Sequence, residues 1–304
     1  MVATPPSEGR PVADDPLSPE FLRKLEYLRV VARHQHAGRF AALTRSRKLG
    51  SGIDFADHRP YTPGDDFKDI DWNLFGRLDR FMIRLAEEDT ELNLYLLVDV
   101  SASMAFGDPT KSEFACRVAA ALSYVGLAHL DRVHLFPFGD NLLPPLHPPR
   151  NKAHAINVYR YLSSQRGAGS SDLSRSVMGF AGVARTRGVV CVLSDFLMES
   201  GWREALDILR AARFEVAVVH LSTPDESAPD LRGELLLRDA ETGRRVRVRV
   251  TPALLKRYRQ AFLEHGKELS SYCRRYNLFY AHARTDTPFE ELVLKTFRAG
   301  RLLG

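Results

Sequence analysis

The chain has 304 residues, of which 44% are hydrophobic and 27% are charged, and its formal net charge is +5. This length accommodates one large α/β domain or two modest ones, and the composition predicts a packed core. No apolar stretch reaches the length that a membrane span requires, so we expect a protein with no membrane span. The modest positive charge permits an acidic partner and makes nucleic acid the less favoured one.

The N-terminus, residues 1–18, is rich in proline and polar side chains and lacks the apolar centre of a signal peptide. We therefore expect it to be a disordered segment of a cytoplasmic protein. The three cysteines, Cys116, Cys191 and Cys273, lie far apart within apolar patterns and lack disulfide or zinc spacing. They are predicted to be core residues of a reduced protein.

Residues 19–90 form an N-terminal segment that we expect to pack on the main domain. Apolar side chains recur on one face of a predicted helix over residues 19–32. Glycines predict a loop over residues 50–55, and a proline and a glycine predict a turn over residues 61–66. Residues 70–72 and 81–85 are predicted to be extended.

Residues 91–304 form the main domain, in which predicted strands and helices alternate. Strands are expected at residues 92–98, 133–138, 189–193, 214–221 and 278–282. One helix is expected to follow a capping box at residues 110–113. Further helices are expected at residues 153–163, 172–187, 202–212, 252–276 and 288–298. A hairpin is expected between residues 234–238 and 245–250. This alternation predicts an α/β fold with a doubly wound, mostly parallel, Rossmann-like sheet.

Side chains with oxygen atoms follow the apolar strand at residues 92–98. Asp99, Ser101 and Ser103 alternate at its carboxyl end, Ser171 lies in a later glycine-containing loop, and Asp195 ends a later strand. Because the carboxyl ends of parallel strands meet at one edge of a sheet, these five residues are expected to converge. Such ligands suit a divalent cation, Mg²⁺ or Mn²⁺. An aspartate followed by serines can instead simply cap a helix, but the two later segments favour the metal site.

This arrangement resembles the metal-ion-dependent adhesion site of von Willebrand factor A domains. In that family two serines and a threonine or serine of a second loop bind the metal, and two aspartates usually act through coordinated waters. Matched residue by residue, these roles fall to Ser101, Ser103, Ser171, Asp99 and Asp195. Ser170, next to Ser171, is the alternative for the second loop. The resemblance implies that a carboxylate of a partner protein completes the metal shell.

Four motifs before the main domain resemble the signature of the "domain of unknown function 58" family of bacteria and archaea. They are residues 50–55 (GSGIDF), 59–61 (RPY), 64–66 (GDD) and 70–72 (IDW). One departure is Lys68, where the family often has arginine. Family members join this signature to a von Willebrand A-like domain. The resemblance implies a MoxR-type AAA+ ATPase as partner and a chaperone-like role in assembling or activating protein complexes, without catalysis.

Two alternatives stay open. A metal-dependent hydrolase of phosphate esters could use Asp99, Ser101 and Asp195, but the sequence has no phosphate-binding loop, nucleophile elbow or metalloprotease motif. Basic residues alternate with valines over residues 245–250, so one strand face is basic. That face either protects an edge strand from aggregation, which we favour slightly, or forms a docking patch. The partner of such a patch would be an acidic protein surface or, as the weaker alternative, nucleic acid.

Overall fold

The computed structural model describes residues 54–62, 70–87, 92–128, 130–165, 169–198 and 201–288, together with Arg23 and Phe67. The chain divides into two compact units, residues 37–91 and residues 1–36 with 92–304. Apart from Arg23, the helix predicted over residues 19–32 lies outside the described residues. So do residues 63–66 of the predicted turn and the last predicted helix beyond Pro288.

The smaller unit contains an antiparallel pair of strands and a short helix. Strand β1 (Asp54–Pro60) pairs with β2 (Met82–Glu87), and helix α3 (Trp72–Leu78) precedes β2. β2 confirms the extended stretch at residues 81–85. Of the loop predicted over residues 50–55, residues 54 and 55 belong to β1 instead, and residues 50–53 lie outside the described residues. The prediction that residues 70–72 are extended is wrong at Trp72, which begins α3. Asp71 causes the change, because its carboxylate accepts hydrogen bonds from two amides of the first turn.

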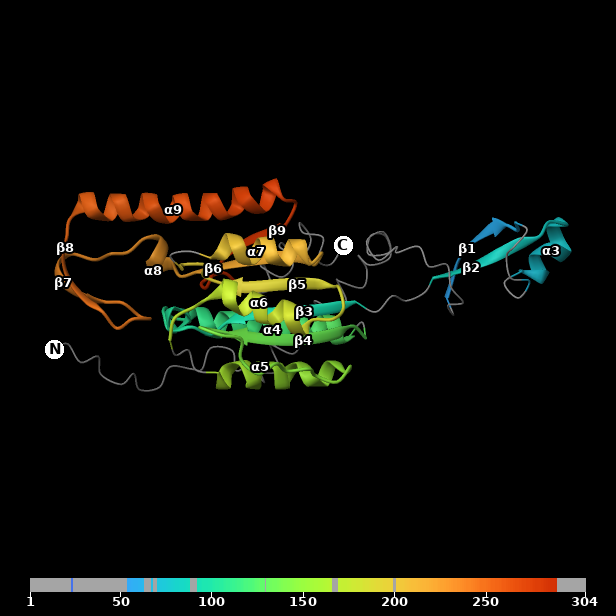
Figure 1. The fold of residues 1–304 in the computed structure, drawn as a ribbon, viewed down its shortest axis with the longest axis horizontal. Helices are drawn as coiled ribbons and strands as arrows, with labels where there is room; N and C mark the ends of the chain where they lie inside the picture. The colour runs from blue at the N-terminus through green and yellow to red at the C-terminus, as the bar shows by residue number, and fades with distance from the viewer. Residues whose placement is uncertain are drawn as a thin grey trace. The chain divides into compact units, whose positions relative to one another are not determined.

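Five strands of the described residues form the central sheet of the larger unit, and each pairs in parallel with its neighbours (Figure 1). The sheet has the order β4-β3-β5-β6-β9. The strands are β3 (Asn93–Asp99), β4 (Arg132–Phe138), β5 (Val189–Ser194), β6 (Glu215–Ser222) and β9 (Phe279–Arg284). From β3 the chain winds first outward to β4 and then back across to β5. The strand order therefore reverses between β3 and β5, which is where open α/β sheets bind ligands.

Helices cover both faces of this sheet. On one face Leu94, Leu96 and Val98 of β3 pack in an apolar cluster with α4 (Lys111–Ala128) and α5 (Ala155–Ser164). On the other face Tyr95 and Leu97 pack with α6 (Leu173–Val183), α7 (Trp202–Ala211) and α9 (Pro252–Arg275). A strand buried on both sides explains the nearly continuous apolar run of β3. The prediction of a doubly wound α/β fold is confirmed.

Several local predictions also hold. The capping box forms, because the Thr110 amide donates to the Glu113 carboxylate and the Glu113 amide donates to the Thr110 hydroxyl, both at 3.1 Å. The hairpin forms as β7 (Gly233–Arg238) and β8 (Arg245–Val250), a separate antiparallel pair. The three cysteines are free and buried, as expected of core residues. In the described part of the chain, no helix has the length and apolar character needed to cross a membrane.

One helix is shorter than predicted. α6 ends at Val183, four residues before the expected end at Arg187. Beyond it, Thr186 forms hydrogen bonds with the Tyr95 hydroxyl of β3, its carbonyl oxygen accepting at 2.9 Å. This irregular segment before β5 therefore contacts the sheet through Thr186, which the helical periodicity does not reveal.

Candidate functional site

The candidate site lies at the carboxyl ends of β3 and β5, on the two sides of the point where the strand order reverses. β3 ends at Asp99, and β5 ends at Ser194, directly before Asp195. The loop that leads into α6 brings Ser171 to the same edge. This loop is fixed by Asp172, whose carboxylate caps α6 by accepting a hydrogen bond from the Arg175 amide at 2.9 Å.

The Asp99 carboxylate is the centre of the site and is fully buried. Its Oδ1 accepts a hydrogen bond from the Ser101 amide at 2.9 Å, and its Oδ2 accepts one from the Ser171 hydroxyl at 3.1 Å. The Ser101 and Ser103 hydroxyls lie 3.1 Å apart. The structure thus connects four of the five predicted ligands. It also separates Ser171 from its neighbour Ser170, whose hydroxyl donates to Asp140 instead.

Ser194 is a member of the site that the sequence analysis did not assign. Its hydroxyl donates to Asp99 Oδ2 at 2.6 Å and accepts from the Phe196 amide at 3.0 Å. It therefore links the ends of β3 and β5 through one buried hydroxyl. Its place directly before Asp195, at the end of a buried strand, is the signal that could have identified it.

Asp195, the fifth predicted residue, is buried beside these groups but has different partners. Its Oδ1 accepts from the Leu197 amide at 3.1 Å, and its Oδ2 accepts from the Lys111 ammonium at 2.6 Å. Lys111 is only 1% exposed and also pairs with Glu226. Burial alone would lower the pKa of Lys111, but Asp195 and Glu226 outweigh this effect and raise the pKa. The sequence analysis missed this ion pair.

Burial dominates the electrostatics of Asp99. It raises the pKa of the carboxyl from its ordinary value of 3.8 to about 6, and the negative charge of Asp195 adds to the rise. Hydrogen bonds from Ser101 and Ser194 offset part of this shift. Two buried carboxylates close together favour a bound cation, because a positive ion offsets both the lost hydration and the mutual repulsion.

The donor set fits a hard divalent cation. The hydroxyls of Ser101, Ser103 and Ser171 and the carboxylate of Asp99 offer only oxygen atoms, as Mg²⁺ and Mn²⁺ prefer. Across the described ranges, no group of three or more histidine, cysteine, aspartate or glutamate side chains could hold a metal ion. Metal binding here would therefore depend on the serine hydroxyls together with the two aspartates.

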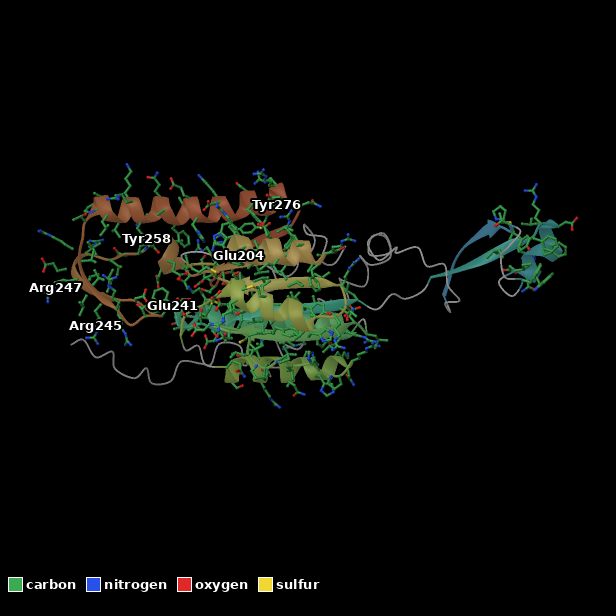
Figure 2. All side chains as sticks on the ribbon, in the orientation of Figure 1. Glu204, Glu241, Arg245, Arg247, Tyr258 and Tyr276 are labelled. Atoms are coloured by element: carbon green, nitrogen blue, oxygen red, sulfur yellow. The ribbon has the colours of Figure 1, made fainter. Side chains whose placement is uncertain are left out.

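The charges of Asp195 and Asp99 also act on a third carboxylate, that of Glu241. Glu241 lies in the turn between β7 and β8 and is labelled in Figure 2. Burial, and then the charges of Asp195 and Asp99, raise the pKa of Glu241. The sequence analysis predicted this residue only as part of a hairpin turn.

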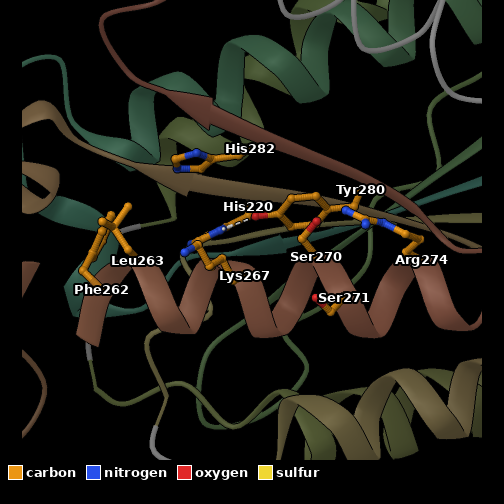
Figure 3. A pocket seen from close by; sticks show the side chains of 10 residues that line it. His220, Phe262, Leu263, Lys267, Ser270, Ser271, Arg274, Tyr280 and His282 are labelled. Carbon is orange, nitrogen blue, oxygen red and sulfur yellow. Dashed lines mark hydrogen bonds between the residues drawn. The ribbon is translucent and has the colours of Figure 1, made fainter. Parts of the chain in front are cut away.

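A pocket of about 290 Å³ lies between α9 and the strands β6 and β9 (Figure 3). Its lining includes His220 and His282 from the strands and Lys267 and Arg274 from the helix. The His220 Nδ1 lies 3.0 Å from the Tyr280 hydroxyl. Burial, then His282 and His265, lower the pKa of His220 to about 3, so the imidazole is neutral at physiological pH. No sequence motif pointed to this pocket.

Comparison with known proteins gives the family. Residues 57–268 match the family described as "Protein of unknown function DUF58", which is more than half of the chain. The chain belongs to the DUF58 family. This DUF58 protein is 29% identical over 296 residues to an uncharacterized protein of Mycobacterium tuberculosis, which covers 94% of this chain and 90% of the relative. An uncharacterized protein of Mycobacterium bovis matches with the same values.

Two solved structures similar to the DUF58 protein come from Bacteroides species. The conserved hypothetical protein BatB from Bacteroides thetaiotaomicron is 13% identical, and the match covers 68% of this chain and 98% of that one with a TM-score of 0.41. An aerotolerance-related membrane protein from Bacteroides fragilis is 14% identical, covering 68% of this chain and 99% of that one with a TM-score of 0.40.

Proposed function

We propose that this DUF58 protein is a non-catalytic adaptor that binds a divalent cation at the candidate site and then a carboxylate of a protein partner. Its metal ligands would be Asp99, Ser101, Ser103, Ser171 and Asp195. The observation that supports this proposal is the convergence of separate segments on the buried Asp99 carboxylate. Such a group is costly to bury unless a cation compensates its charge.

The residues divide into two roles around the ion. The hydroxyls of Ser101, Ser103 and Ser171 would bind it directly, while Asp99 and Asp195 supply negative charge from the buried side. Asp195 keeps its hydrogen bonds to Lys111 and Leu197, which suits contact with the ion through water. A partner carboxylate would then contact the ion itself, so metal and partner binding should be thermodynamically coupled.

An acidic partner also fits the surface near the site. Arg245, Arg247 and Arg249 are exposed on β8, and Lys256, Arg257 and Arg259 are exposed on the first turns of α9. Figure 2 shows Arg245 and Arg247 on the hairpin that carries Glu241. Such a basic surface would increase the association rate of an acidic protein. Within this proposal the partner is a MoxR-type AAA+ ATPase and the process is the assembly or activation of protein complexes, as the family resemblance implies.

The direct test is calorimetric titration of the purified protein with the MoxR-type ATPase of the same genome, in Mg²⁺ and in EDTA. Binding is expected in Mg²⁺ for the native chain and is expected to be lost in EDTA and in Asp99→Ala. Asp230→Ala is the matched control, because the Asp230 side chain is 84% exposed and pairs only with Arg232 in the described structure.

Two results would contradict the adaptor. Equal binding of the ATPase in Mg²⁺, in EDTA and by Asp99→Ala would exclude a metal-bridged contact. Turnover of para-nitrophenyl phosphate by the native protein, lost in Asp99→Ala, would instead favour the metal-dependent hydrolase.

A further inference from the structure

The pocket between α9 and the strands β6 and β9 is separate from the candidate metal site, because none of the five proposed metal ligands lines it. Its volume of about 290 Å³ is close to the lower limit of roughly 300 Å³ for small-molecule sites. The pocket therefore suits a small molecule better than a segment of a protein chain.

One face of α9 supplies the polar side of the pocket. Lys267, Ser270 and Arg274 recur at the spacing that places side chains on one side of a helix, and Figure 3 shows them on the side that faces the strands. Lys267 and Arg274 are about 10 Å apart along the helix axis. Both side chains are long, so one group bound between them can contact both.

The positive charge of this face is not balanced within the described structure. Among the described residues, the lining of the pocket includes no aspartate or glutamate. The two glutamates of α9 pair elsewhere, since Glu264 accepts from Gln260 at 2.9 Å and Glu268 pairs with Arg203. A bound anion would supply the missing negative charge, and charge-assisted hydrogen bonds from lysine and arginine are among the stronger polar contacts.

His220 supplies an unsatisfied polar atom on the opposite wall. The residue is only 2% exposed, and its Nδ1 lies 3.0 Å from the Tyr280 hydroxyl, whereas its Nε2 forms no hydrogen bond with the described residues. When the tyrosine donates to Nδ1, the proton of the neutral imidazole lies on Nε2, which is then a donor. A buried donor without an acceptor is unfavourable, and an oxygen of a bound anion would satisfy it.

One end of the pocket is apolar. Phe262 and Leu263 line it, one turn of α9 before Lys267, and Leu263 is 60% exposed. An exposed leucine beside basic side chains offers a surface for the apolar part of a ligand. The pocket thus combines an apolar end with a cationic one.

We propose that this pocket binds a small organic anion. Its phosphoryl or carboxylate group lies between Lys267 and Arg274, and its apolar part lies against Phe262 and Leu263. This binding activity is additional to the adaptor function and does not depend on the metal site.

The test is calorimetric titration of the full-length chain in EDTA with phenylphosphonate, benzoate and neutral benzyl alcohol. We expect at least one of the two anions to bind and benzyl alcohol not to bind. In the double variant Lys267→Gln and Arg274→Gln, the affinity for that anion should fall roughly tenfold or more, because both charge-assisted contacts are lost. The matched control is Lys256→Gln with Arg259→Gln, which removes two exposed charges of α9 outside the pocket and should bind as the native chain does.

The two anions identify the chemistry of the ligand. Binding of phenylphosphonate alone supports a phosphoryl ligand, and binding of benzoate alone supports a carboxylate ligand. Binding of neither anion at millimolar concentration, equal binding of benzyl alcohol, or equal affinities of the two double variants would overturn the proposal. Because EDTA removes divalent cations, these results do not depend on the outcome of the ATPase titration.

Discussion

At the scale of one residue, Asp99 is the group on which the proposed metal site depends. Its carboxylate is buried without an ammonium or guanidinium partner in the described structure, and backbone and hydroxyl donors satisfy it instead. Hydrogen bonds from neutral groups stabilise a buried anion less than a full positive charge does. A group in this position reduces the stability of the empty protein, as is common for residues selected for binding.

We predict that Asp99→Asn stabilises the metal-free protein at pH 7.5. The pKa of Asp99 is about 6 in the folded state against an ordinary value of 3.8, so the folded protein binds the proton more tightly. The ionised carboxylate therefore destabilises the fold above pH 6, and this cost disappears as the pH falls from 6 toward 3.8. Urea denaturation in EDTA should show a gain on the order of 2 kcal/mol at pH 7.5 that shrinks toward pH 4.

The same variant should gain nothing from Mg²⁺, whereas the native chain should gain about 2.7 kcal/mol at a hundredfold excess over Kd. Asp230→Asn, at an exposed carboxylate, is the control and should match the native chain at every pH. A native protein more stable than Asp99→Asn at pH 7.5 in EDTA would contradict the role assigned to burial.

Lys111 marks the limit of what sequence could show about individual residues. The serines and aspartates of the site follow strand ends in a recognisable order, so their convergence could be predicted. Lys111 begins α4 beside a capping box, where a lysine normally faces solvent. Its contact with Asp195 joins residues 84 positions apart, and no local pattern encodes it.

At the scale of elements, the start of β5 depends on a close approach to β3. A Cβ placed on Gly188, directly before β5, would overlap the backbone carbonyl oxygen of Asn93 at the start of β3. The two strands could not keep their register around such an atom. Because β3 and β5 carry Asp99 and Ser194, this glycine also helps to position the site.

We predict that Gly188→Ala destabilises the protein by roughly 3 kcal/mol, because a backbone atom cannot move aside as a flexible side chain can. Gly182→Ala is the matched comparison, since a Cβ at Gly182 in α6 meets nothing within 4 Å. It should be neutral or stabilise by up to about 1 kcal/mol through helix propensity. Chemical denaturation of both variants checks this, and equal stabilities would refute the packing argument.

Helices and strands with a clear hydrophobic pattern were predicted correctly. The residues at which they begin and end were predicted less accurately. β3 and β5 are buried on both faces, so continuous apolar runs identified them. The start of α3 at Trp72 depends on the Asp71 cap, and the end of α6 at Val183 is followed by the tertiary contact of Thr186 with Tyr95. Caps and tertiary contacts act on single residues, and a periodicity averaged over many residues does not resolve them.

At the scale of the whole molecule, the parts that form the core and the candidate site lie in one segment of the chain. Both apolar clusters are built from residues between Leu92 and Ala283. The candidate site, Lys111 and the hairpin lie within the same limits. The motifs that resemble the family signature, residues 50–72, lie in the other compact unit. The expectation that residues 19–90 pack on the main domain stays a prediction.

We predict that a fragment of residues 92–304 folds cooperatively and retains its response to Mg²⁺. The fragment contains both apolar clusters of the core completely, so their side chains keep all their packing partners. Calorimetry should show one unfolding transition whose midpoint rises with Mg²⁺, and the Asp99→Ala fragment should lose that rise while keeping the transition. A fragment without a cooperative transition would show that residues 1–91 complete the fold. A cooperative transition that ignores Mg²⁺ would place part of the metal site in those residues.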